Sequence, residues 1–296
     1  MTLDTIAVTG GNGKIGEAIL EHCSEHGYET VNVSRGKRRE EVSDRYVTTD
    51  LLDAGETYGA LAKYDADAVI HMGTIPNPYR NADHRVYESN VLSAAHVLEA
   101  ADALGLESVV LPSSINAIGS EHQERPADVR YLPVDEDHPR TPDDAYGIAK
   151  HAMEVTADGF GRRPSCDLTI ASLRYPWVTT DEEMREQFRE ADRSLDALAD
   201  VHPATGREVL FSYLAVADAT RIARKAVEAE FEGHEAFWAV AGDTTADAPT
   251  TEVVEAFYPD AERRDGFEGF DGTEGIVDLS KADALLDWQP EHSWRD

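Results

Sequence analysis

The sequence TIAVTGGNGKIG, residues 5–16, predicts both the fold of the chain and one of its ligands. Residues 5–9 form a short apolar run suited to a buried strand, and a helical pattern begins near residue 17. Glycines between them let the backbone turn tightly, approach a pyrophosphate and pack helix on strand, with the phosphates at the helix N-terminus. We therefore expect an α/β protein with a Rossmann-type doubly wound parallel sheet. The expected dinucleotide contacts in this loop are Gly10, Asn12, Gly13, Lys14, Ile15 and Gly16.

The second predicted strand, residues 29–33, ends in a hydroxyl and four cations between Ser34 and Arg39. An NAD site usually carries an acid at this position for the ribose 2′-hydroxyl, and a carboxylate would repel a 2′-phosphate. Ser34 and Arg35 can instead bind that phosphate, and the guanidinium can also stack on adenine. A basic surface loop is the alternative. We expect NADP as the cofactor, with NAD less favoured and Arg38 as a further contact.

Three further predicted strands end at the edge of the sheet where open parallel sheets bind ligands. They cover residues 46–51, 68–73 and 108–111, and an apolar helix is expected to begin at Asn90. We expect His71 to be a packing residue. The residues assigned to the cofactor from these segments are Asp50, Leu51, Met72, Gly73 and Asn90, and the loop beginning at Thr74 is assigned to the substrate.

A tyrosine and a lysine lie four residues apart in the segment 141–150. If Pro142 opens a helix, Tyr146 and Lys150 share one helix face. A nearby ammonium would lower the pKa of the phenol toward the range in which proton transfer is efficient. A buried ring beside a solvated charge is the alternative for this pair alone. Ser114, at the end of the fifth strand, could hydrogen-bond the oxygen that Tyr146 deprotonates.

The composition excludes several classes of partner. The chain has 296 residues and a net charge of −31, from 58 acids and 27 bases spread along its length. This balance argues against nucleic acid or an anionic membrane as a partner, and it resembles proteins adapted to concentrated intracellular salt. No opening run has the length of a signal or membrane segment, so we expect a cytoplasmic protein. Cys23 and Cys166 suggest neither a disulfide framework nor a metal site.

Taken together, these motifs resemble the extended short-chain dehydrogenase/reductase family, also called the NAD-dependent epimerase/dehydratase family. The resemblance implies that Ser114 orients the substrate, that Tyr146 exchanges the proton, and that Lys150 also holds the nicotinamide ribose. It also implies a cofactor contact at Tyr175. The matching residues are Gly10, Gly13, Gly16, Asp50-Leu51, Asn90-Val91, Ser113-Ser114, Ile118-Gly119, Tyr146, Lys150, Leu173 to Pro176 and Asp287 to Pro290.

Departures from the branches of the family narrow the expected reaction. Sugar dehydratases carry an acidic pair after the catalytic hydroxyl, where this chain has Ile115 and Asn116. Nucleotide-sugar epimerases usually place an asparagine where this chain has Trp177. The loop from Ser113 to Gly119 looks most like uronate dehydrogenases and salt-adapted archaeal aldose dehydrogenases, which oxidise the hemiacetal at C1 to a lactone. By this resemblance, Tyr146 would take the C1 hydroxyl proton while hydride passes to the nicotinamide.

The expected function is therefore an NADP-dependent sugar 1-dehydrogenase acting on a neutral pentose or hexose. A uronate dehydrogenase, a nucleotide-sugar epimerase and an NADP sensor without activity stay open as alternatives. Arg174 or Arg207 could clamp a sugar carboxylate, or each could pair with an acid of the protein. The substrate contacts expected are Thr74, Ser114, Ile115, Asn116, Tyr146, Arg174, Trp177 and Arg207.

The expected organisation has two parts. Residues 1–176, with residues 209–240 returning to them, would bind NADP. Residues 177–208 and 241–296 would form a small substrate-binding lobe. Since relatives in the family commonly pair, we also expect a homo-oligomer.

Overall fold

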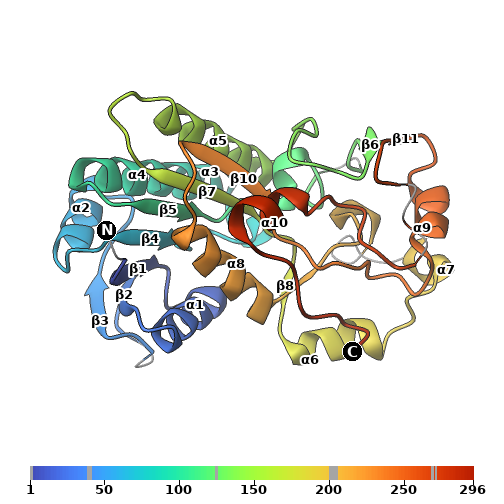
Figure 1. Cartoon of the computed structure of the whole chain (residues 1–296), viewed down its shortest axis with the longest axis horizontal. Helices are drawn as coiled ribbons and strands as arrows, with labels where there is room; N and C mark the ends of the chain where they lie inside the picture. The colour runs from blue at the N-terminus through green and yellow to red at the C-terminus, as the bar shows by residue number, and fades with distance from the viewer. Residues whose placement is uncertain (1–2, 39–41, 124–125, 200–205, 268–269, 271) are drawn as a thin grey trace.

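The computed structural model describes residues 3–38, 42–123, 126–199, 206–267, 270 and 272–296. Arg39, one of the four cations after the second strand, lies outside these residues. Seven parallel strands form the main sheet in the order β10-β7-β5-β4-β1-β2-β3 (Figure 1). The chain therefore starts in the middle of the sheet, winds to one edge and then returns to build the other. The strands are β1 (Thr5–Thr9), β2 (Glu29–Ser34), β3 (Arg45–Thr48), β4 (Ala68–His71), β5 (Ser108–Leu111), β7 (Thr169–Arg174) and β10 (His234–Trp238).

Helices cover both faces of this sheet. Successive side chains of a strand point to opposite faces, and the strands carry apolar residues on each of them. Ile6 and Val8 of β1 pack in the layer that contains α1 (Lys14–Glu25) and α8 (Val216–Glu228). Ala7, between them, belongs to the opposite layer. The helices on that side are α2 (Ala54–Ala62), α4 (Ser93–Leu104) and α5 (Ala145–Gly161) (Figure 1). The doubly wound α/β fold predicted from the sequence is confirmed.

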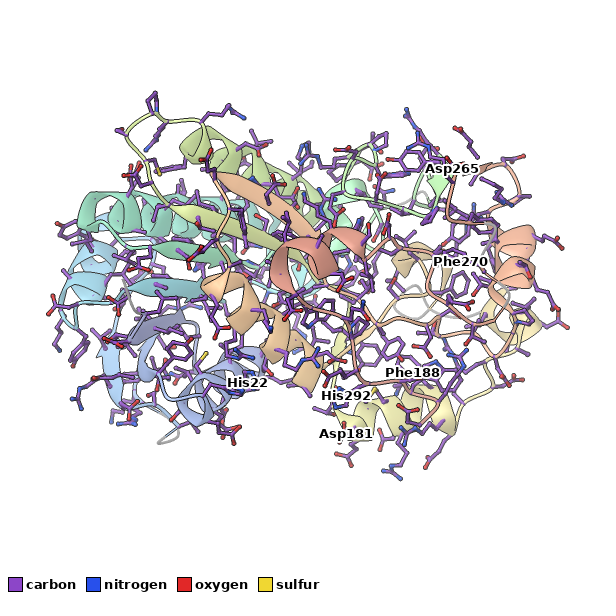
Figure 2. The ribbon with its side chains drawn as sticks, in the orientation of Figure 1. His22, Asp181, Phe188, Asp265, Phe270 and His292 are labelled. Carbon is purple, nitrogen blue, oxygen red and sulfur yellow. The ribbon has the colours of Figure 1, made fainter. Side chains whose placement is uncertain are left out.

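A smaller lobe continues from the end of the sheet where the strands finish, and it has an apolar core of its own that includes Phe211, Val240 and Val253. Phe188, labelled in Figure 2, lies in a second cluster of this lobe with Tyr213. The elements of the lobe are β6 (Tyr131–Leu132), β8 (Val178–Thr179), α6 (Asp181–Met184), η4 (Arg185–Arg189), α7 (Leu195–Ala199), η6 (Arg207–Val209), β9 (Leu214–Ala215), α9 (Thr250–Phe257) and β11 (Glu262–Arg263). The last helix, α10 (Ser280–Leu286), returns to the main sheet and packs in the layer of α1 and α8.

Two helix boundaries differ from those predicted. The helix expected to begin at Asn90 is preceded by η1 (Pro78–Arg80) and α3 (Asp83–Tyr87), and Asn90 lies inside a π-helical turn, η2 (Glu88–Leu92). Pro142 does not open α5. Asp144 caps that helix instead, with Oδ1 accepting from the backbone N–H groups of Tyr146 at 2.8 Å and Gly147 at 2.9 Å. A carboxylate satisfies the first free donors of a helix, which a proline cannot do.

Within the described residues, no helix is long and apolar enough to cross a bilayer. The same part of the chain brings no three His, Cys, Asp or Glu side chains together in an arrangement that could hold a metal ion.

Candidate active site

A pocket of about 1080 Å³ runs along the carboxyl ends of the central strands. Both halves of the predicted site open into it: the glycine loop after β1 and the polar residues after β5. The residues predicted from the sequence that line it are Gly10, Asn12, Gly13, Lys14, Ile15, Gly16, Ser34, Arg35, Asp50, Leu51, Met72, Gly73, Thr74, Ser114, Ile115, Asn116, Tyr146, Tyr175 and Trp177.

The glycine loop has the close packing that a dinucleotide cradle requires. Gly10 has a φ of +69°, and a Cβ there would stand 2.7 Å from the backbone of Met72, the residue that follows β4. A Cβ on Gly16 would stand 2.5 Å from the carbonyl oxygen of Gly10. Side chains at these positions would therefore displace the loop that brings the N-terminus of α1 to the pocket. The residues present fit a dinucleotide, with its pyrophosphate at that N-terminus.

The end of β2 presents a hydroxyl at the pocket, held by two hydrogen bonds. Ser34 Oγ donates to Asn32 Oδ1 at 2.7 Å and accepts from the backbone N–H of Asn12 at 3.1 Å. Arg35 also lines the pocket. Arg38 does not, because its guanidinium donates to the carbonyl of Ser43. The role of Arg38 as a cofactor contact stays a prediction.

Ser114 and Tyr146 meet at the other end of the pocket. Ser114 Oγ accepts from the backbone N–H of Asn116 at 3.2 Å and lies 3.2 Å from the carbonyl oxygen of Tyr175, to which it donates. Tyr146 is buried, and Ser114 lies close enough to its phenol to lower the phenol pKa. The Lys150 ammonium lies 5.3 Å from the centre of the Tyr146 ring. It donates to the carbonyl of Pro112 and to Thr74 Oγ1, the latter at 3.4 Å.

The electrostatic prediction for this pair is wrong. Burial raises the pKa of the Tyr146 phenol, and the hydrogen bond with Ser114 opposes this only in part. Burial also lowers the pKa of Lys150 to about 7, against an opposing effect of Glu154. Both groups lose hydration inside the fold, and this loss outweighs the attraction between an ammonium and a phenolate. In this structure the lysine directs its ammonium at the carbonyl of Pro112.

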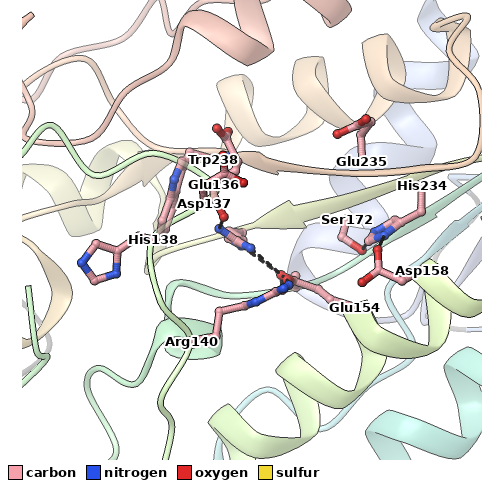
Figure 3. Close-up of polar contacts among 12 residues, drawn as sticks. Glu136, Asp137, His138, Arg140, Glu154, Asp158, Ser172, His234, Glu235 and Trp238 are labelled. Carbon is pink, nitrogen blue, oxygen red and sulfur yellow. Dashed lines mark hydrogen bonds and ion pairs between the residues drawn. The ribbon is translucent and has the colours of Figure 1, made fainter. Parts of the chain in front are cut away.

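Arg174 is not a substrate clamp, because it is buried in an ion pair with Glu154 of α5. Its Nε and Nη2 donate to the two oxygens of Glu154 at 3.0 and 2.9 Å. The Arg140 side chain reaches the same carboxylate (Figure 3). It donates to Glu154 at 2.9 Å, and Ser113 donates to Glu154 at 2.5 Å. Burial raises the pKa of Glu154, but these hydrogen-bonded and charged partners outweigh burial and lower the pKa to about 2. The alternative, an arginine paired with an acid of the protein, therefore applies.

Arg207 and Asn90 also lie away from the pocket. The Arg207 guanidinium lies 5.8 Å from the centre of the Tyr258 ring, within the lobe. Asn90 is fully buried; its Oδ1 accepts from the N–H of Ile75 at 2.7 Å and its amide donates to the carbonyl of Ile75 at 3.0 Å. The asparagine thus fixes the loop beside Thr74 without touching the pocket. His71 is a packing residue, between Thr9 and Ser93.

Several residues that were not predicted from the sequence also line the pocket. They include Glu121 and His122, which follow the Ser113–Gly119 loop, and Gln187, which reaches the pocket from the lobe. Proximity to that loop was the signal in the sequence for Glu121 and His122, and nothing local pointed to Gln187. The pocket is lined further by Ile75, Asn77, Tyr79, Arg85 and Ser89.

A Rossmann-type sheet with a glycine-loop pocket defines a class of dinucleotide-binding proteins, and comparison with known proteins gives the family. Residues 6–237 match the NAD dependent epimerase/dehydratase family. The chain belongs to this family, as its motifs suggested.

Individual relatives agree with this membership. An NAD-dependent glucose-6-phosphate dehydrogenase of Haloferax volcanii is 31% identical over 200 residues, covering 62% of this chain and 72% of that protein. A UDP-glucose 4-epimerase of Rhizobium leguminosarum is 28% identical over 180 residues, covering 59% and 52%. The first curated relatives are matched over only about half of their length. The structure of MoeE5 in complex with UDP-glucose and NAD has a TM-score of 0.69 at 20% identity, covering 98% of this chain and 95% of that one.

Proposed function

We propose that this protein oxidises C1 of a free aldose to the lactone, with NADP as the oxidant. The observation that carries the proposal is that one pocket is lined both by the glycine loop and by Ser114 and Tyr146. A hydroxyl group held at Ser114 would therefore stand at the end of a dinucleotide site, which is the arrangement that hydride transfer requires.

In the proposed reaction, the residues of the chain position the sugar and handle the proton. Ser114 Oγ holds the C1 oxygen. Because burial raises the pKa of the phenol, Tyr146 has to act in its phenolate form, which the positive charge of an oxidised nicotinamide would favour. As the phenolate it takes the proton of the C1 hydroxyl while the C1–H bond breaks and C1 becomes a carbonyl. The cofactor, when bound, supplies the hydride acceptor. Lys150 has a pKa of about 7, so it can carry or release a proton near neutral pH.

We assign the cofactor preference to Ser34 and Arg35, and we keep the division of the chain predicted from the sequence. Residues 1–176 and 209–240 would bind NADP, and residues 177–208 and 241–296 would contribute to the substrate side. Support for the second part comes from Trp177, Val178 and Gln187, which line the pocket.

A nucleotide-sugar epimerase is the second candidate, favoured by the relatives that carry that name. An epimerase regenerates its cofactor in each turnover, whereas a dehydrogenase accumulates reduced cofactor. The two functions therefore predict different products from the same pocket.

The experiment is to mix the protein with NADP in high salt, add neutral aldoses, uronates or nucleotide sugars, and follow the absorbance of the reduced nicotinamide. The proposal expects reduction with a free aldose, and expects Tyr146→Phe to abolish it while NADP affinity stays nearly intact. Epimerised nucleotide sugar without net reduction would establish the second candidate. Turnover that survives in Tyr146→Phe would show that another group is the base.

A further inference from the structure

Two polar side chains that the proposed mechanism does not use lie beside the catalytic tyrosine. Gly119 has a φ of +89°, and a Cβ there would meet the carbonyl oxygen of Thr141 at 2.8 Å. The N–H of Thr141 donates to the carbonyl of Ile118 at 3.1 Å, which ties this turn to the segment before α5. The turn carries Glu121 and His122 to the pocket wall near Tyr146.

The contacts of His122 fix it at that wall. Its ring meets the Tyr146 ring edge-on, with centroids 5.2 Å apart, and its Nδ1 lies 3.2 Å from Tyr79 Oη. Its Nε2 lies 3.8 Å from Glu121 Oε2, too far for a hydrogen bond. The two side chains are 7% and 19% exposed. Because their polar atoms are largely shielded from water, hydroxyl groups of a ligand in the pocket would be favourable partners for them.

The charge around this pair is negative. Burial and the carboxylates of Asp144 and Glu208 raise the pKa of Glu121, and His122 opposes this effect. Asp144 Oδ2 is buried without a partner among the described residues. Arg85 lines the same end of the pocket, but its Nη1 donates to Glu88 at 2.7 Å. The arginines expected to bind a sugar carboxylate, Arg174 and Arg207, face other parts of the fold.

We propose that Glu121 and His122 select a neutral aldose by hydrogen-bonding its hydroxyl groups, and that the Glu121 carboxylate rejects sugars with a carboxylate or a phosphate. This inference rests on the proposed function, since it assumes that a sugar is bound over Tyr146. A carboxylate accepts hydrogen bonds from adjacent hydroxyls, and these charge-assisted bonds are among the stronger ones. The negative charge of Glu121 also repels an anion at short range in a partly desolvated site. Glu121 would therefore both bind the hydroxyl groups of a neutral sugar and reject a charged one.

The test compares the wild-type protein with Glu121→Gln, which keeps the shape of the side chain and removes its charge. Binding of a neutral hexose, its uronate and its 6-phosphate is measured by calorimetry in the presence of NADP, and kcat/KM is measured with the same sugars. The wild-type protein should prefer the neutral sugar. Glu121→Gln should shift the ratio of neutral to anionic affinity by about tenfold or more toward the anions. Glu255→Gln, which removes an exposed charge on α9, should leave the ratio unchanged.

A second variant, His122→Gln, should raise KM for the neutral sugar with a smaller effect on kcat. If Glu121→Gln leaves the affinity ratio as it was, or if the wild-type protein prefers the anions, the inference is overturned while the dehydrogenase proposal stands. Selective binding of neutral sugars without turnover would support the inference and remove the proposed reaction. Absence of both sugar binding and turnover would overturn the two together.

Discussion

Ser34 is the residue on which the proposed preference for NADP depends. Its hydroxyl is oriented by Asn32 and by the N–H of Asn12, so a substitution there changes the group presented to the adenosine ribose. Ser34→Asp would place a carboxylate where a 2′-phosphate is proposed to bind. Repulsion should raise the Kd for NADP at least tenfold, while the Kd for NAD changes little.

Titration of cofactor fluorescence or calorimetry measures this change, and Ser34→Ala is the matched control because it removes the hydroxyl without adding charge. If the ratio of the Kd for NADP to the Kd for NAD is the same in Ser34→Asp and in the wild-type protein, Ser34 is not part of the proposed site.

Lys150 should make stability depend on pH. Burial lowers its pKa from 10.5 to about 7 in the folded protein. Between these values the unfolded chain binds one more proton than the folded chain, so this residue makes the free energy of unfolding rise with pH, by up to about 1.4 kcal/mol per unit. Below pH 7 the lysine is protonated in both states and contributes no slope.

Lys150→Met removes this contribution. Urea unfolding of both proteins at pH 6, 7.5 and 9 should show the wild-type protein gaining stability relative to the variant as the pH rises. Parallel curves across this range would mean that the lysine keeps its proton inside the fold.

At the scale of elements, the Glu154 carboxylate joins three parts of the site. It bonds Arg174 at the end of β7, Ser113 at the end of β5 and Arg140 before α5, the helix that carries Tyr146 and Lys150. Glu154→Gln would leave the Arg174 guanidinium buried without its counter-charge and should lower the free energy of unfolding by about 3–5 kcal/mol.

The control is Glu88→Gln, which breaks the exposed ion pair with Arg85. It should lower the free energy of unfolding by at most about 1 kcal/mol. The double variant Glu154→Met with Arg174→Met should recover part of the loss, because it removes both buried charges. Urea unfolding measures all three. A Glu154→Gln loss no larger than that of Glu88→Gln would show that the buried pair does not hold these elements together.

These elements could be predicted where the interactions that form them join residues close together in the sequence. Strand patterns and the glycine loop are local, so the sheet and the cofactor half of the pocket could be predicted. The partner of Arg174 lies twenty residues earlier on another element, and nothing local distinguishes it from a surface acid. Asn90 was placed at a helix start because its apolar successors suggested one, whereas the chain was already helical. His122 reaches Tyr146 only through the turn at Gly119.

At the scale of the molecule, one apolar surface suggests how copies would associate. Ile148 and Val155 lie two turns apart on α5, and Tyr87 and Leu92 lie on the neighbouring helical segment; all four are large and exposed. Such a group on one surface is typical of a protein interface.

We expect a homodimer through this surface. The double variant Ile148→Glu with Val155→Glu should therefore be a monomer in light scattering. Leu285→Glu, an exposed position on α10, should not. A monomeric wild-type protein would contradict the expectation.

The charge of the whole molecule predicts how its stability responds to salt. With 58 acids and 27 bases, pairing every base still leaves 31 acids without a partner. Their mutual repulsion opposes the compact state at low ionic strength, where the screening length is long, and is largely removed when that length falls to about 3 Å in molar salt. We therefore expect the Tm to rise by roughly 5 °C or more between 0.1 and 2 M KCl, which corresponds to about 3 kcal/mol for a chain of this size. Sucrose at matched osmolality separates screening from solute exclusion, because it stabilises compact states without screening charge. A Tm that is independent of KCl, or that rises equally in sucrose, would show that the acids are accommodated by other means and that adaptation to concentrated salt is the wrong interpretation of this composition.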